Sequence, residues 1–208
     1  MINDYIELIR IRQWYKNLLV FLAIFFSGYL FNFTKIYVVI LAFSSLSFVS
    51  SVGYIINDLN DLERDKLHPE KKSRALASGK ISRFKTILTG FILLVAGFII
   101  AYNLNWQFFF LLSLFLVLEL AYTFLLKGVL FADVITISLL FVTRAIGGAI
   151  AINVFISPWL ILCPFFLALF LALGKRHSDL LLLKEKAEST RKVLAIKLPT
   201  ISIFSFPG

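Results

Sequence analysis

Long uninterrupted apolar runs alternate with short polar segments along the 208 residues of this chain. The runs lack the period-two alternation of transmembrane strands, and about 20 apolar residues in a helix cross a ~30 Å hydrocarbon core. We therefore expect an all-α fold, a polytopic membrane helix bundle that forms one membrane domain over residues 1–208. The expected spans, six in number, are 17–34, 36–56, 85–104, 106–126, 130–152 and 157–174.

Composition supports a membrane protein and excludes an ordinary soluble domain. Hydrophobic residues make up 60% of the chain and charged residues 16%, whereas soluble domains carry about 25% charged residues. The single cysteine, Cys163, excludes a disulfide framework and a cysteine-based metal cluster, and we expect it to serve helix packing. The N-terminal segment lacks the pattern of a cleavable signal peptide, so the first span is expected to act as its own insertion signal.

The net charge of +9 reflects basic residues in the polar segments, so we expect no nucleic acid partner. Four segments on one side of the six spans together hold 18 Lys and Arg, and the opposite side holds Lys35. Cytoplasmic loops carry the excess of Lys and Arg. The sequence therefore predicts a multi-pass plasma-membrane protein whose N-terminus and whose loops 57–85 and 175–192 are cytoplasmic. The stretch after Lys192 reads as the start of a further helix, so we expect the chain to be incomplete at its C-terminal end.

An acidic cluster at the end of the second span carries the clearest chemistry. Asp58, Asp61 and Asp65 are spaced by three and four residues, which places them on one helical face, and Asn57 borders that face. Oxygen ligands without His or Cys suit Mg²⁺, which is commonly held by one or two carboxylates and by substrate phosphate oxygens. The alternative is an ordinary solvated acidic helix end.

A basic segment follows the acidic cluster. Arg74 is the candidate phosphate contact, because Lys and Arg neutralise the phosphate charge that a metal leaves uncompensated. His68, which precedes Pro69, is expected to shape the turn. The pattern predicts a site for a metal-bound diphosphate.

The sequence resembles the UbiA superfamily of intramembrane prenyltransferases, whose first aspartate-rich motif, NDxxDxxxD, matches residues 57–65 at all four positions. Within the superfamily it is most similar to the decaprenyl-phosphate phosphoribosyltransferases. The similarity runs from about residue 10 to about residue 192. The supporting segments are 12–17, 54–79, 122–127, Asp133, 144–149 and 173–176.

The resemblance implies further substrate-binding residues, each with a plainer alternative. Lys16 is implied as a phosphate contact, or anchors the chain at the membrane interface. Arg144 lies mid-span, where a guanidinium needs a partner or a wet cavity, so it pairs with Glu119 or contacts substrate. Its neighbours Gly147 and Gly148 are expected to permit close helix approach. The other candidates, which could instead be interfacial or positive-inside residues, are Tyr122, Lys127, Asp133, Lys175, Arg176 and Asp179.

The resemblance implies a Mg²⁺-dependent transferase. The expected reaction moves phosphoribose from phosphoribosyl diphosphate, a soluble cosubstrate, to a polyprenyl (decaprenyl) phosphate with release of diphosphate, in cell-wall biosynthesis. One alternative is prenylation of an aromatic acceptor such as 4-hydroxybenzoate by a polyprenyl diphosphate. A second alternative is an inactive truncated product or a non-enzymatic membrane protein, since the family normally has about nine spans.

Overall fold

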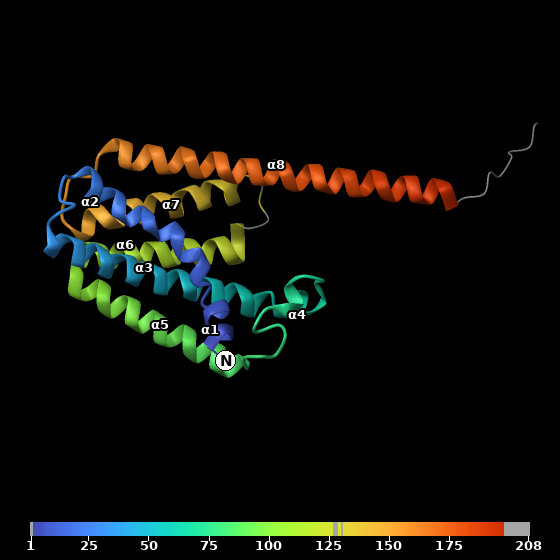
Figure 1. Cartoon of the computed structure of the whole chain (residues 1–208), viewed down its shortest axis with the longest axis horizontal. Coiled ribbons are helices and arrows are strands. Elements are labelled where there is room, and N and C mark those ends of the chain that lie inside the picture. Colours follow the sequence, from blue (N-terminus) through green and yellow to red (C-terminus); the bar gives the residue numbers. More distant parts are fainter. Residues whose placement is uncertain (1, 127–128, 130, 198–208) are drawn as a thin grey trace, which may run out of the picture. The chain divides into compact units, whose positions relative to one another are not determined.

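The computed structural model describes the backbone of residues 2–126, 129 and 131–197, and the side chains of residues 3–126, 129 and 131–178. Within these residues every regular element is a helix, which confirms the all-α prediction. The chain forms two compact units, residues 1–169 and 170–208. The first unit holds the helix bundle (Figure 1).

The elements follow one another along the chain with short connections. The short N-terminal elements include an unusually long 3₁₀ helix, η1, and the α6 helix continues into a π-helical segment, η3. In chain order they are α1 (Ile2–Leu8), η1 (Ile11–Phe21), α2 (Leu22–Phe26), α3 (Phe33–Asn60), α4 (Leu62–Leu67), η2 (Lys71–Ser73), α5 (Arg83–Leu104), α6 (Trp106–Ala121), η3 (Tyr122–Leu126), α7 (Ala132–Ala151) and α8 (Pro158–Lys197).

Five helices in the described part are long and apolar enough to cross a membrane, and they coincide with five of the predicted spans. The first predicted span, 17–34, differs, because it is divided among η1, α2 and a turn. Gly28 adopts a positive φ of 76° in that turn, a conformation that ends a helix readily. Asn32 then caps a new helix by accepting the Lys35 N–H at 3.0 Å.

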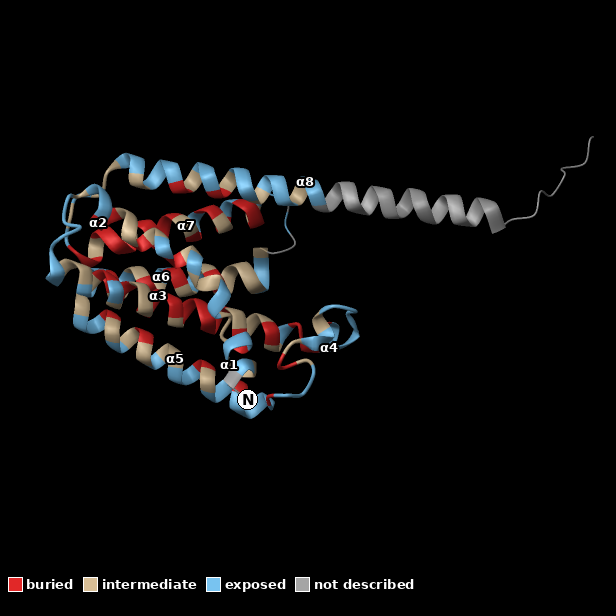
Figure 2. Cartoon of the chain, viewed as in Figure 1, coloured by how far each residue is buried: buried red, intermediate tan, exposed pale blue. Residues whose placement is uncertain are grey.

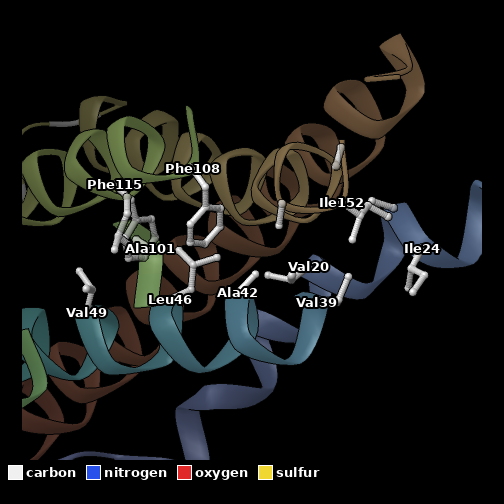
Figure 3. Close-up of a cluster of buried hydrophobic side chains, with 14 of the residues drawn as sticks. Val20, Ile24, Val39, Ala42, Leu46, Val49, Ala101, Phe108, Phe115 and Ile152 are labelled. Atoms are coloured by element: carbon white, nitrogen blue, oxygen red, sulfur yellow. The ribbon is translucent and has the colours of Figure 1, made fainter. Parts of the chain in front are cut away.

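The core of the first unit lies between α3, α6, α7 and the η1–α2 segment (Figure 3). The α3 and α7 helices are mostly buried, whereas few residues of α5 and α6 are buried. Phe108 and Phe115 of α6 are fully buried against Leu46 and Val49 of α3 in one cluster. Burial of these side chains fixes α3 as the central helix, and its last turn carries Asp58.

Small polar side chains of α3 hold η1 against it. The Trp14 indole N–H donates to the Ser51 hydroxyl at 3.0 Å, and the Asn17 amide donates to the Ser47 hydroxyl at 3.0 Å. Ser51 in turn donates to the Ile9 carbonyl at 2.8 Å. Because buried polar groups must be paired, these bonds fix the N-terminal segment along the central helix.

Two glycines permit close approach of neighbouring elements. A Cβ at Gly148 would clash with the Val20 backbone carbonyl, and a Cβ at Gly53 would clash with the Glu119 carboxylate. Small residues at such positions let membrane helices pack tightly. A Cβ at Gly147 would lie only 3.1 Å from the Leu111 side chain, so the predicted close approach at Gly147 and Gly148 is confirmed.

Many residues on the outside of the bundle are exposed (Figure 2), and large apolar side chains are common among them. On α5, for example, Phe91, Ile92 and Ile99 are each more than half exposed. Such a surface would be unstable in water but suits a bilayer. The sixth predicted span, 157–174, lies in α8, which continues as a helix to Lys197.

Candidate functional site

Three buried carboxylates lie where the central helix ends. Asp58 is in the last turn of α3, Asp61 occupies the junction with α4, and Asp65 lies in α4. Their exposed fractions are 6%, 9% and 3%, whereas Glu63 and Arg64 between them are exposed. The alternative of an ordinary solvated helix end therefore does not describe these aspartates. Buried carboxylates require cationic or hydrogen-bonding partners.

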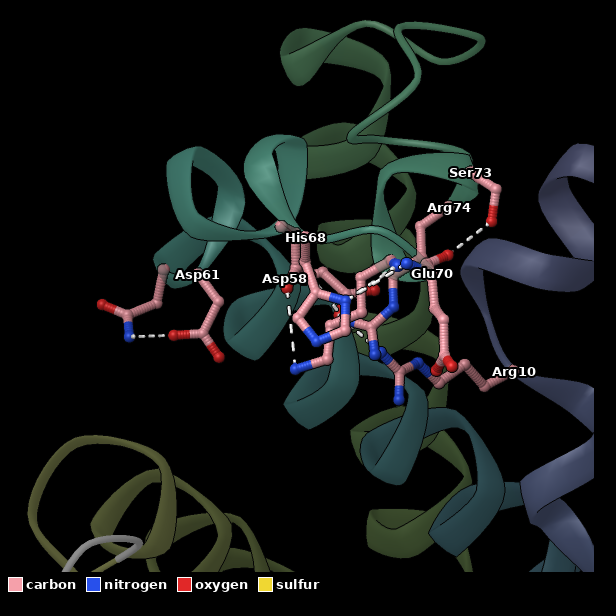
Figure 4. Close-up of polar contacts among 10 residues, drawn as sticks. Arg10, Asp58, Asp61, His68, Glu70, Ser73 and Arg74 are labelled. Atoms are coloured by element: carbon pink, nitrogen blue, oxygen red, sulfur yellow. Dashed lines mark hydrogen bonds and ion pairs between the residues drawn. The ribbon is translucent and has the colours of Figure 1, made fainter. Parts of the chain in front are cut away.

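Arg74 supplies one such partner to two of the aspartates. Its Nη1 donates to Asp58 Oδ1 at 3.1 Å and to Asp65 Oδ2 at 2.5 Å. Lys71 Nζ lies 3.9 Å from the other oxygen of Asp65. Figure 4 shows Arg74 beside Asp58, with Asp61 pointing away from this group. The basic segment thus lies beside the aspartate cluster, and the role of Arg74 as a phosphate contact stays a prediction.

Arg10 is a further member of the cluster that the sequence did not single out. Its Nη2 donates to Asp58 Oδ1 at 2.5 Å, and its guanidinium carbon lies 4.9 Å from the centre of the Tyr54 ring. The backbone of Arg10 is left-handed, with φ 51° and ψ 50°. This residue lies 48 positions from Asp58, so periodicity along one helix could not connect them. Its place in a basic N-terminal segment was the one sequence feature that pointed to a role in binding phosphate.

The end of α3 separates two pockets. The α1-side pocket, of about 710 Å³, is lined by Asn3, Ile6, Glu7, Leu8, Arg10, Arg12, Gln13, Asp58, Arg74, Ala75 and Leu76. The α6-side pocket, of about 530 Å³, is lined by Asn60, Asp61, Arg64, Asp65, Lys71, Thr123, Phe124 and Leu125. Each pocket contains both carboxylates and basic side chains. The acidic motif therefore faces two separate spaces.

The donor set bears on the predicted Mg²⁺ site. In the described part of the chain, no three His, Cys, Asp or Glu side chains lie close enough together to hold a metal ion. Two carboxylates and phosphate oxygens are nevertheless a usual ligand set for Mg²⁺. Asp61 and Asp65 line one pocket and fit this set, and Asp65 already pairs with the cationic groups of Arg74 and Lys71.

His68 shapes the turn after α4, as predicted. Its Nδ1 accepts the backbone N–H groups of Glu70 at 3.2 Å and Lys71 at 3.4 Å. On the nearby surface, the hydrogen bond and charge of Lys66 lower the pKa of the exposed Glu63 carboxyl, assisted by Arg83.

Arg144 is buried in the bundle with several partners. Its Nε donates to Asn17 Oδ1 and its Nη1 donates to the Leu140 carbonyl, both at 2.7 Å. Nη2 lies 3.7 Å from Glu119 Oε1, the predicted partner. The guanidinium carbon lies 4.7 Å from the Phe115 ring centre. These contacts support the structural reading of Arg144, and Asn17 is a partner that the sequence did not identify.

The remaining candidates of the first unit lie on several elements. Lys16 is half-buried on η1, with its Nζ 5.9 Å from the centre of the Tyr15 ring. Tyr122 begins the π-helical segment η3 and is half-buried, and Asp133 is buried in the first turn of α7. Lys127 lies outside the described residues.

Three candidates lie in the second unit, on α8. Lys175 is exposed and Arg176 is half-buried. For Asp179 the structure describes the backbone, which is helical, and not the side chain. The roles of these residues stay predictions.

Known proteins are similar to this chain over most of its length. A protein of Mycolicibacterium smegmatis named decaprenyl-phosphate phosphoribosyltransferase is 33% identical over 198 residues, which cover 93% of this chain and 62% of that protein. The uncharacterized protein y4nM of Sinorhizobium fredii is 36% identical over 178 residues, 86% of this chain and 34% of that protein. The chain thus spans from about a third to just under two thirds of the length of these relatives.

A solved structure from a study of digeranylgeranylglyceryl phosphate synthase in membranes shares the fold. The TM-score is 0.70 at 22% identity, over 88% of this chain and 65% of the other. In addition, residues 17–201 match the model of the UbiA prenyltransferase family. The resemblance that rested on the motif at residues 57–65 is thereby confirmed. Its helices and its relatives together show that this chain is a multi-pass membrane protein of the UbiA prenyltransferase family, a family of transferases.

Proposed function

We propose that this protein transfers phosphoribose from phosphoribosyl diphosphate to a polyprenyl phosphate, such as decaprenyl phosphate, and releases diphosphate. The observation that carries the proposal is the pair of pockets on either side of the end of α3, each lined by cationic side chains. Two phosphate-bearing substrates require two such places, because phosphate charge must be neutralised separately on donor and acceptor. The name of the M. smegmatis relative supports the same substrate pair.

The α6-side pocket suits the diphosphate of the donor. Asp61 and Asp65 would hold Mg²⁺ there with Asn57 beside them, and the ion would stabilise negative charge on the leaving diphosphate. Lys71 and Arg64 line the same pocket and would bind phosphate oxygens that the metal leaves uncompensated. These residues orient the donor so that its leaving group is held before the bond breaks.

The reaction itself is a substitution at ribose C1. The bond from C1 to the diphosphate oxygen breaks, and the leaving diphosphate keeps the electron pair. A phosphate oxygen of the lipid forms the new bond to C1, so no redox partner or further co-reactant is needed. The acceptor is already an anion, which means that no general base is required to activate it. The apolar outer surface of the bundle leaves the isoprenoid chain of the acceptor in the bilayer.

We place the end of α3 on the cytoplasmic side, since the donor is water-soluble and the basic loops lie there under the positive-inside rule. On this placement the Arg74 segment meets the donor from the aqueous phase. The lipid phosphate reaches the same level at the membrane interface. Both substrates can then meet without either phosphate crossing the hydrocarbon core, where an unpaired charge is costly.

A label-transfer assay tests the proposal. Membranes containing the protein are incubated with phosphoribosyl diphosphate labelled in the ribose, decaprenyl phosphate and Mg²⁺, and the lipid fraction is counted. We expect label in the lipid, and the Arg83→Gln variant should behave as the unaltered protein because Arg83 pairs with the exposed Glu63.

Two outcomes would contradict the proposal. Transfer that occurs with a polyprenyl diphosphate and 4-hydroxybenzoate instead would establish the aromatic prenyltransferase. Inactivity with both substrate pairs would favour a non-enzymatic or inactive protein.

A further inference from the structure

We propose that the α1-side pocket is a metal-independent binding site for a phosphate group, and that Asp58 serves it by holding Arg10 and Arg74 in place rather than by binding a metal. This inference rests on the proposed function, because it assigns one of the two substrate phosphates to this pocket. It divides the aspartate motif between two tasks. Asp61 and Asp65 face the α6-side pocket, and Asp58 faces the other.

The first support is the engagement of Asp58. Its Oδ1 accepts hydrogen bonds from two guanidinium groups, Arg10 at 2.5 Å and Arg74 at 3.1 Å. These two bonds tie Asp58 to the arginines of the α1-side pocket, whereas Asp61 and Asp65 are the carboxylates of the motif that line the α6-side pocket. Its side chain is 8% exposed, whereas those of Arg10 and Arg74 are 24% and 29% exposed. The carboxylate is therefore covered, and the arginines reach the pocket.

The second support is that Arg10 and Arg74 keep N–H donors that their bonds to the aspartates do not use. A guanidinium carries five N–H donors and matches phosphate in a bidentate geometry. Arg10 and Arg74 each use a single nitrogen in their bonds to the aspartates. The remaining nitrogens can donate to an anion in the pocket. Arg12 adds a third guanidinium to the lining, and among the described residues Glu7 is the one carboxylate other than Asp58 that lines this pocket.

The third support is the backbone of Arg10. A left-handed conformation in a residue that is not glycine, asparagine or aspartate is uncommon and carries a cost. Here it lies at the junction of α1 and η1, and the side chain packs over Tyr54 on its way to Asp58. A salt bridge that merely joined α1 to α3 could be made from a relaxed backbone. The geometry instead favours one defined position for this guanidinium, beside that of Arg74.

The phosphate could belong to the soluble donor, as its 5-phosphate, or to the head group of the lipid acceptor. Both present the same dianionic chemistry to the arginines. Binding of either needs no Mg²⁺, since the charge is neutralised by guanidinium groups alone. The α1-side pocket should therefore bind phosphate without a metal, whereas the α6-side pocket should need one. Binding measured with the metal removed tests this difference directly.

The test is equilibrium binding to the full purified chain in detergent, with EDTA present, by isothermal titration calorimetry. One arm uses ribose 5-phosphate and the other farnesyl phosphate, so the arm that binds identifies the source of the phosphate. We expect binding of at least one probe, about tenfold weaker in Arg10→Gln and in Arg74→Gln, since loss of one charge-assisted bond has roughly this effect. Arg10→Lys should recover part of the affinity, and Arg83→Gln should leave it unchanged.

The division of the aspartates is tested by binding of Mn²⁺, a paramagnetic substitute for Mg²⁺, with inorganic diphosphate, measured by electron paramagnetic resonance. Asp61→Asn should weaken Mn²⁺ binding and leave phosphate binding in EDTA unchanged. Asp58→Asn should do the reverse. If Asp58→Asn does not fold, Arg10→Gln answers the same question, because it should weaken phosphate binding and leave Mn²⁺ binding unchanged.

The inference is overturned if no phosphate probe binds in EDTA, if Arg10→Gln binds as the unaltered chain does, or if Asp58→Asn or Arg10→Gln loses Mn²⁺. These results differ from a failure of the proposed function. Label transfer to decaprenyl phosphate with phosphate binding that requires a metal would refute the inference alone. Metal-independent phosphate binding without label transfer would refute the proposed reaction and leave the pocket in place.

Discussion

Replacing Arg144 by leucine should destabilise the bundle strongly, although the change is from a charged to an apolar residue inside a membrane protein. The guanidinium is buried and bonds Asn17 and the Leu140 carbonyl, and it lies 3.7 Å from Glu119. Leucine removes all of these contacts together. The Glu119 carboxylate then stays in the bundle without its nearest cation.

The expected size follows from these contacts. Removing one partner of a buried ion pair costs about 3–5 kcal/mol, because the remaining charge is left uncompensated. Neutral hydrogen bonds inside membrane proteins are worth less, about 0.6 kcal/mol on average. The 3.7 Å between Arg144 Nη2 and Glu119 Oε1 is longer than a direct hydrogen bond, which places the expected loss near the lower bound, about 3 kcal/mol. For a chain of this size that corresponds to a fall of roughly 6–12 °C in the midpoint of thermal unfolding.

The assay is thermal unfolding in detergent, followed by circular dichroism, of four proteins: the unaltered chain, Arg144→Leu, Glu119→Gln and the double variant. Glutamine has the size of glutamate, so it fits the space against Gly53. The double variant should be more stable than Arg144→Leu, since the stranded charge has been removed. If the double variant shows the sum of the two single losses, the two residues are not coupled and the reasoning is refuted.

Further changes test the site and the packing. Asp61→Asn should abolish Mg²⁺-dependent label transfer, and EDTA should do the same to the unaltered chain; unchanged turnover in the variant would rule out Asp61 as a metal ligand. Gly148→Leu should lower the unfolding temperature by about 4 °C or more, because overpacking costs at least 1–3 kcal/mol and a Cβ there would clash with the Val20 carbonyl. The pKa of Glu63 is lowered mainly by its hydrogen bond from Lys66, so this interaction stabilises the fold above the ordinary glutamate pKa and is lost as pH falls through the lowered value. Lys66→Gln should raise the titration midpoint of Glu63, measured by NMR; an unmoved midpoint would show that Lys66 is not the cause.

The helical architecture could be predicted because the length and hydropathy of an apolar stretch identify a membrane span. Five of the spans follow this rule. The first did not form one helix, because Gly28 and the capping Asn32 interrupt a stretch whose mean hydropathy stays high. Hydropathy averaged over about 20 residues does not reveal a single residue with a positive φ. The break is what separates η1 and α2 from the start of α3.

The local part of the site was also predictable, and the long-range part was not. The end of the second span predicted where the aspartates lie, and Arg74 lies only 16 residues from Asp58, but the single helical face expected from the aspartate spacing is interrupted at Asp61, between α3 and α4. Arg10 and Asn17 reach their partners across 48 and 127 residues. Such contacts depend on how η1 packs on α3 and α7. The spacing of residues along the sequence does not predict this packing. The helical spacing also did not reveal that Asp58 and Asp61 line different pockets.

The left-handed backbone of Arg10 sets two selection pressures against each other at one position. Its φ of 51° suits glycine or asparagine, whereas its bond to Asp58 requires a guanidinium. No single amino acid satisfies both, so this chain gives up some folding stability at position 10 to keep the charge. A library selected for heat resistance alone should therefore accumulate glycine or asparagine there, and one selected for activity should retain arginine.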